Sequence, residues 1–149
     1  MKQKYTGGCQ CGKVRFEVQT EIGKVISCNC SRCSKLGSLL SAAPASDFTL
    51  LSGADAMTTF QFNKHVINHP FCSTCGIQSF ASGKGRDGSD MVMLNVRCLD
   101  GVDPETFEVM KFDGRSMWAA SAWAIQKAIT GRPSSARHKL SDPFPGYAR

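Results

Sequence analysis

The sequence predicts a small, mainly β domain that resembles a β-sandwich, with several short antiparallel strands and one short helix near the C-terminus. Two observations lead to this prediction. Short runs that alternate apolar and polar residues recur along the chain between Gly, Pro, Asp and Asn residues, as short strands do between turns. In addition, 149 residues with 42% hydrophobic content suffice for one core and do not require a second.

The clearest strand is predicted at residues 14–18. Val14, Phe16 and Val18 alternate there with polar residues, directly after a turn that contains Gly12. This alternation gives the strand one buried and one exposed face. The same pattern and the same turn residues predict further strands at residues 24–27, 38–43, 48–52, 58–63, 77–81, 91–96 and 107–112.

One helix is predicted, at residues 116–130. This stretch is rich in Ala, and Gly131 and Pro133 follow it, as they often follow the end of a helix. From residue 132 onward, prolines and scattered polar residues predict an irregular tail. We therefore expect one domain over residues 1–131 and a tail over residues 132–149.

The eight cysteines favour metal binding over disulfides. The basic start of the chain, residues 1–5, leads into Gly7 and Gly8 and not into an apolar segment, so we expect a cytoplasmic protein that does not enter a membrane. Thiols stay reduced in that compartment, where clustered cysteines bind metal or take part in catalysis. Pairs with i,i+2 spacing are also too close for a relaxed disulfide.

Seven of the eight cysteines form three clusters, which predict two zinc sites. A structural zinc ion takes four thiolates, commonly from two turns that are distant in sequence. The first and third clusters provide such pairs, and Gly12 and Gly76 directly after them suit tight turns. The ligands predicted for this closed, structural zinc are Cys9, Cys11, Cys72 and Cys75. Zinc bound there would staple the first strand to the middle of the chain.

The middle cluster, Cys28, Cys30 and Cys33, predicts a second zinc site with three ligands and an open fourth position. Zinc with an open position can hold a thiol as thiolate, which is a ready nucleophile, so these cysteines are the candidate catalytic residues. The alternative is a closed site, completed by Cys98, His65 or His69. For Cys98 we expect a buried, unreactive thiol.

The formal net charge of +6 gives little support to a nucleic-acid partner. Four thiolates on one zinc ion leave −2 and three on another leave −1, so two such sites would reduce the charge to about +3. The basic residues of the tail also lack interleaved aromatic residues for base stacking.

Three segments with their flanking glycines, residues 7–16, 28–33 and 71–76, resemble the glutathione-dependent formaldehyde-activating enzyme family, which includes the zinc-binding domain of centromere protein V. The resemblance extends from about Gly7 to Trp118. It implies a mainly β, zinc-stapled fold over the predicted domain and the formation of S-(hydroxymethyl)glutathione, a carbon-sulfur lyase activity. It also implies a structural zinc on Cys9, Cys11, Cys72 and Cys75, and a catalytic zinc on Cys28, Cys30 and Cys33. Asn29 departs from the family pattern, which often has His at this position.

We therefore predict a zinc-dependent enzyme of the carbon-sulfur lyase type. Its partners would be a small thiol such as glutathione and a small carbonyl compound such as formaldehyde. Arg32 and Lys35 follow the catalytic cysteines closely and are candidates for pairing with the carboxylates of the thiol. The alternative function is a non-catalytic zinc module that binds a partner, or a carrier of thiol or zinc.

Overall fold

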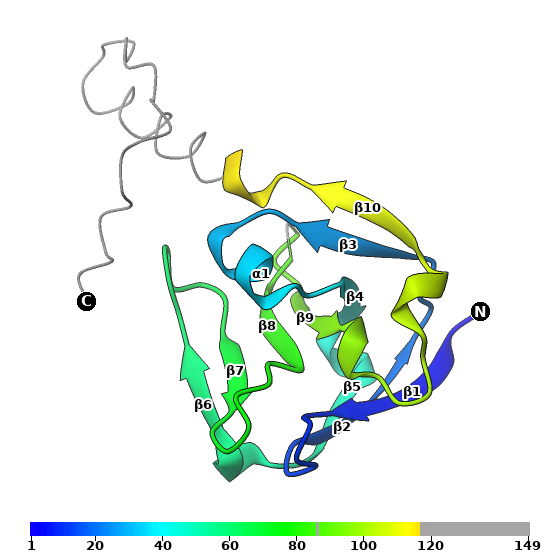
Figure 1. The fold of residues 1–149 in the computed structure, drawn as a ribbon, viewed down its shortest axis with the longest axis vertical. Helices are drawn as coiled ribbons and strands as arrows, with labels where there is room; N and C mark the ends of the chain where they lie inside the picture. Colours follow the sequence, from blue (N-terminus) through cyan, green and yellow to red (C-terminus); the bar gives the residue numbers. More distant parts are fainter. Residues whose placement is uncertain (86, 117–149) are drawn as a thin grey trace, which may run out of the picture. The chain divides into compact units, whose positions relative to one another are not determined.

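The computed structural model describes residues 1–85 and 87–116 of the chain. Its first sheet has three antiparallel strands in the order β1-β2-β5. These strands are β1 (Gln3–Gly8), β2 (Arg15–Thr20) and β5 (Phe48–Ser52). Figure 1 shows this sheet at the end of the fold that holds the N-terminus.

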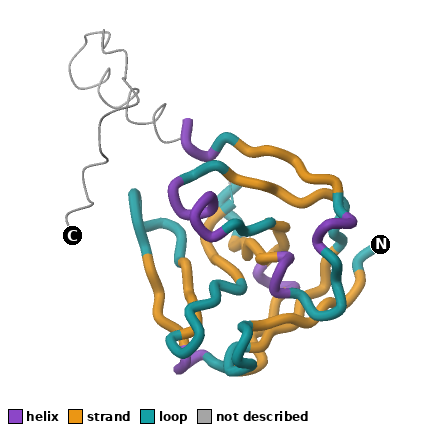
Figure 2. The backbone as a smooth tube through the Cα atoms, in the orientation of Figure 1, coloured by secondary structure: helices purple, strands orange, loops and turns teal. Residues whose placement is uncertain are grey.

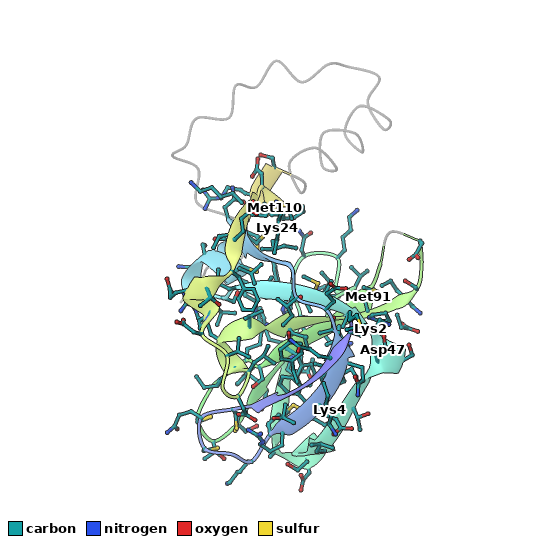
Figure 3. The ribbon with its side chains drawn as sticks, turned by 90° about the vertical axis from the view of Figure 1, so that its right-hand side faces the viewer. Lys2, Lys4, Lys24, Asp47, Met91 and Met110 are labelled. Atoms are coloured by element: carbon teal, nitrogen blue, oxygen red, sulfur yellow. The ribbon has the colours of Figure 1, made fainter. Side chains whose placement is uncertain are left out.

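The second sheet has five strands in the order β10-β3-β4-β9-β8. Its members are β3 (Lys24–Cys28), β4 (Leu40–Pro44), β8 (Phe80–Lys84), β9 (Asp90–Asn95) and β10 (Glu108–Phe112). All its pairings are antiparallel except that of β10 with β3, which is parallel. Figure 3 shows Lys24 and Met110 on these two neighbouring strands, and the Lys24 ammonium lies 2.7 Å from the Glu108 carboxylate.

The described fold also has a separate two-stranded ladder, one short α-helix and four short 3₁₀ helices. The ladder pairs β6 (Met57–Phe60) with β7 (His69–Cys72). The helix, α1 (Ser31–Leu36), follows β3 directly. Figure 2 shows how little helix there is beside the strands. None of the described helices has the length and hydropathy that a membrane span needs.

The core lies where side chains of the two larger sheets meet. Phe16 of β2 and Leu94 of β9 are fully buried. The ring of Phe48, from β5, lies 5.3 Å from that of Phe16 and 4.8 Å from that of Phe80, measured between centroids. Burial of these apolar side chains is the main force that holds the sheets together. The prediction of a small, mainly β fold is therefore confirmed.

The structure also corrects several predicted elements. Strand β5 has the predicted bounds, β3 and β10 differ from theirs by one residue at one end, and β9 begins and ends one residue earlier than predicted. Strands β1 and β7 and helix α1 were not predicted, and β8 lies three residues later than predicted. Apart from Ser116, the predicted helix at residues 116–130 lies outside the described residues, and so does the predicted tail. The contacts within the chain define one unit over Met1–Asp113 and a second that begins at Gly114.

Candidate metal centres

Two turns, each with a glycine after its second cysteine, hold the first set of cysteines. Cys9 and Cys11 lie in the turn between β1 and β2, where the Gly12 amide donates to the Cys9 carbonyl oxygen at 3.1 Å. Cys72 ends β7, and the Gly76 amide donates to the Cys72 carbonyl oxygen at 2.8 Å. Both glycines have positive φ, +78° at Gly12 and +76° at Gly76. Residues with a side chain rarely adopt this backbone conformation. The two turns thus share a glycine with positive φ, although the first is closed over three residues and the second over four.

These turns bring four sulfur atoms together, and we refer to Cys9, Cys11, Cys72 and Cys75 as the four-cysteine group. Their sulfurs all lie within 4.8 Å of one another. The Cys11 sulfur is 3.5 Å from that of Cys9 and 3.6 Å from that of Cys72. Cys9 and Cys72 are buried, whereas Cys11 is exposed. The Val14 amide also donates to the Cys9 sulfur at 3.3 Å.

Backbone amides favour the thiolate form of two members of this group, Cys72 and Cys75. Hydrogen bonds from the amides of Cys11 and Ile77 lower the pKa of Cys75 to about 6. The pKa of Cys72 is also lowered, mainly by the amide of Cys75. Thiolates this close repel one another, so a cation among them would remove the repulsion. Four convergent sulfurs with amide donors form a donor set that fits a metal ion with four ligands.

The end of β3 and the start of α1 hold the second set, Cys28, Cys30 and Cys33, which we call the three-cysteine group. Their sulfurs lie within 4.8 Å of one another. Cys30 is the N-cap of α1, and its sulfur accepts the Cys33 amide at 3.4 Å. The Cys28 sulfur accepts the Cys30 amide, also at 3.4 Å. The helix ends at Gly37, which has a φ of +62°.

The three thiols differ in acidity. The hydrogen bond from the Cys33 thiol, with help from the backbone amides of Cys33 and Arg32, lowers the pKa of Cys30 to about 5. Burial raises the pKa of Cys28. The pKa of Cys33 is raised by its hydrogen bond to Cys30 and by burial. One thiolate and two neutral thiols are therefore favoured in the metal-free group, and a cation would be needed to ionise all three.

The candidates for a fourth ligand lie elsewhere. Among the described residues, neither Cys98, His65 nor His69 brings a ligand atom into the three-cysteine group. His69 is buried against the ring of Phe62, at 5.2 Å between centroids. Cys98 is half-buried, and burial raises the pKa of its thiol, so the thiol is protonated at neutral pH. The three sulfurs fit a metal ion that keeps one position for another ligand.

A cavity of about 510 Å³ lies beside the three-cysteine group. Cys28 and Cys33 line it, and so do three charged residues, Arg97, Lys111 and Asp113. The Asn29 side chain donates to the Asp113 carboxylate at 2.8 Å, and the Asn29 amide donates to the Phe112 carbonyl oxygen at 3.1 Å. These bonds hold the end of β10 beside the cysteines. The cavity is within the usual size range for sites that bind small molecules.

The charged residues of this cavity are not the ones the sequence suggested. Arg32 and Lys35 do not line it. Arg32 instead donates two hydrogen bonds to the side chain of Gln78. The residues that were missed, Arg97 and Lys111, are far from the cysteines in sequence, and Lys111 reaches the site only because β10 pairs with β3. No local signal in the sequence indicates that pairing.

Comparisons with known proteins show which family the chain resembles. The sequence profile of the family described as "glutathione-dependent formaldehyde-activating enzyme" matches residues 4–113. A crystal structure of a Rhodobacter sphaeroides protein from structural genomics is similar to this chain, with a TM-score of 0.62 and 31% sequence identity. The similarity covers 70% of this chain and 99% of that protein. The match over most of the chain shows that it belongs to the glutathione-dependent formaldehyde-activating enzyme family.

Proposed function

We propose that the chain is a zinc-dependent enzyme that joins a thiol such as glutathione to a small carbonyl compound such as formaldehyde. One observation carries this proposal. Cys28 and Cys33 belong to a group of three sulfurs, and both line a cavity that also contains cationic side chains. Three cysteine ligands beside a space for a ligand are typical of zinc that takes part in a reaction.

We assign the two groups different roles. The four-cysteine group would hold a structural zinc, since its four sulfurs complete a tetrahedral set. Cys28, Cys30 and Cys33 would hold the second zinc. Zinc bound there would keep a thiol in its thiolate form at neutral pH.

The reaction needs no external oxidant or reductant. The thiol sulfur forms a bond to the carbonyl carbon, the carbon-oxygen π bond breaks, and the proton that the thiol gave up ends on the new hydroxyl oxygen. In the proposed complex, Arg97 and Lys111 attract the carboxylates of glutathione, and Asp113 attracts its ammonium group. These charges would orient the thiol so that its sulfur faces Cys28 and Cys33.

Metal content and turnover of a Cys30→Ser variant test the proposal. The wild type should contain two zinc ions per chain, and the variant one, because Ser is a poor ligand for zinc. The rate at which the variant forms S-(hydroxymethyl)glutathione should also be about a hundredfold lower than that of the wild type, or lower still. Metal analysis gives the first result, and NMR exchange between formaldehyde and its thiol adduct gives the second.

Cys98→Ser is the matched control, because Cys98 belongs to neither group. It should keep two zinc ions and full activity. A wild type that contains two zinc ions and binds glutathione, but does not accelerate the reaction, would support a thiol carrier and contradict the enzyme. A wild type with a single zinc ion would contradict the proposed second site.

A further inference from the structure

Helix α1 positions part of the three-cysteine group, yet it buries none of its own side chains. Cys30 caps its start and Cys33 lies within it. A helix of six residues is not stable alone, because the cost of its first turn is repaid only over a longer helix. Contacts made from outside the helix must therefore determine where it lies.

Several of these contacts come from Arg32, which lies between the two cysteines. Its Nε and Nη2 both donate to the Gln78 side-chain oxygen, at 2.8 Å and 2.6 Å. Its guanidinium also lies over the ring of Phe60, 4.7 Å from the centroid. Hydrogen bonds from a charged donor are stronger than neutral ones, particularly when they are partly buried. Arg32 thus connects α1 to Gln78 through two charge-assisted hydrogen bonds.

Gln78 is itself held in a fixed position. It is only 9% exposed, and its Nε2 lies 3.4 Å from the Nδ1 of His69, which is 7% exposed. The backbone carbonyl oxygen of Gln78 accepts a hydrogen bond from the Asn95 side chain at 3.2 Å. A buried amide with both ends engaged has little freedom to move.

The support for Gln78 comes from the turn of the four-cysteine group. His69 lies three residues before Cys72, and Gln78 lies three residues after Cys75. The Cys72 amide donates to the Ile77 carbonyl oxygen at 3.0 Å, which closes this segment of chain. The turn that presents two sulfurs of the four-cysteine group therefore also places the partner of Arg32.

We infer that Gln78 is a positioning residue that couples the two cysteine groups. It holds Arg32, and through Arg32 it fixes α1 so that the sulfurs of Cys30 and Cys33 stay in reach of a metal ion shared with Cys28. This inference rests on the proposed function insofar as it assigns a zinc ion to the three-cysteine group. The part that concerns the position of α1 is independent of that assignment.

Two variants of Gln78 separate hydrogen bonding from space filling. Gln78→Leu keeps the volume and removes the acceptor, whereas Gln78→Glu keeps an acceptor for Arg32. We expect Gln78→Leu to weaken zinc binding at the three-cysteine group about tenfold or more, and Gln78→Glu to stay within about threefold of the wild type. A chromophoric chelator in competition for zinc measures this affinity. Lys35→Leu, on the exposed side of the same helix, is the control and should change nothing.

Hydrogen-deuterium exchange of α1 gives a second readout, in protein with zinc in the four-cysteine group only. The Ser34 amide donates to the Cys30 carbonyl oxygen and the Gly37 amide to that of Cys33, both at 3.0 Å. We expect these amides to exchange about tenfold faster in Gln78→Leu, because the helix opens more often. Arg32→Leu should produce the same increase, and the double variant no more than either alone.

The outcomes distinguish the inference from the proposed function. Unchanged affinity and unchanged exchange in Gln78→Leu, with zinc retained in the four-cysteine group, would overturn the role of Gln78. If the wild type binds only one zinc ion, the proposed function fails, and the exchange of the α1 amides still decides whether Gln78 positions the helix. If Gln78→Leu does not fold, unchanged exchange in Arg32→Leu would overturn the inference.

Discussion

At the scale of single residues, His69 shows how burial determines a charge state. Burial, and then the nearby positive charge of Arg32, lower the pKa of His69 to about 4. The ring is therefore neutral at pH 7. In the unfolded chain the same side chain takes up a proton near pH 6.5. Between these two pKa values the unfolded state binds more protons, so folding stability decreases as the pH falls from about 6.5 to 4.

This difference predicts the pH dependence of a His69→Gln variant. Between pH 7.5 and pH 5.5, the free energy of unfolding of the wild type should fall by roughly 1 kcal/mol more than that of the variant. Urea unfolding at the two pH values measures both. Acid effects on the cysteine groups occur in both proteins and cancel in the comparison. A His69→Gln variant that retains the wild-type pH dependence would contradict the prediction.

At the scale of secondary structure, the two missed strands share a cause. Gly7 and Gly8 end β1 and have the composition of a turn, yet Gly7 pairs with Leu99, which is far away in sequence. Strand β7 has four residues and contains Pro70, which argues against a strand. Pairing across the fold thus overrode local propensity. The strands with clear alternation, such as β2, could be predicted because their pattern is local.

Glycines at different places in the fold should differ in how much stability is lost when alanine replaces them. A Cβ on Gly7 would lie 2.5 Å from the Cys98 carbonyl oxygen and 2.7 Å from the Phe16 ring, so Gly7→Ala should cost about 3 kcal/mol or more. A Cβ on Gly76 would have no atom within 4 Å, so Gly76→Ala should lower the free energy of unfolding only through its positive φ, by about 1 kcal/mol. Gly23→Ala has neither penalty and is the control. Chemical denaturation gives the three values, and equal costs for Gly7 and Gly76 would contradict this account.

At the scale of the whole molecule, the two cysteine groups connect very different lengths of chain. The four-cysteine group joins residues 9 and 75, whereas the three-cysteine group spans only residues 28 to 33. A cross-link that closes a long loop removes more entropy from the unfolded chain. The spacing of the cysteines allowed us to predict the clusters, whereas the pairing of the first cluster with the third was the simplest of several combinations that spacing left open. The cavity wall formed by Lys111 and Asp113 depends on a parallel pairing across 84 residues, which spacing does not reveal.

This asymmetry predicts that Cys72→Ser destabilises the protein far more than Cys28→Ser. Because of loop closure alone, the free energy of unfolding of Cys72→Ser should be roughly 2 kcal/mol lower than that of Cys28→Ser. Thermal unfolding of zinc-loaded protein measures the difference, with Cys98→Ser as the control outside both groups. Equal destabilisation by Cys72→Ser and Cys28→Ser would show that the four-cysteine group is not the main staple.

Strand β10 has a consequence for the evolution of the family. All five of its residues are exposed in the described structure, yet Lys111 and Phe112 also line the cavity. Substitutions of exposed side chains usually change the folding free energy little. Mutations can therefore alter which molecules this cavity accepts while the scaffold stays intact, so that new specificities can arise without an accompanying loss of stability.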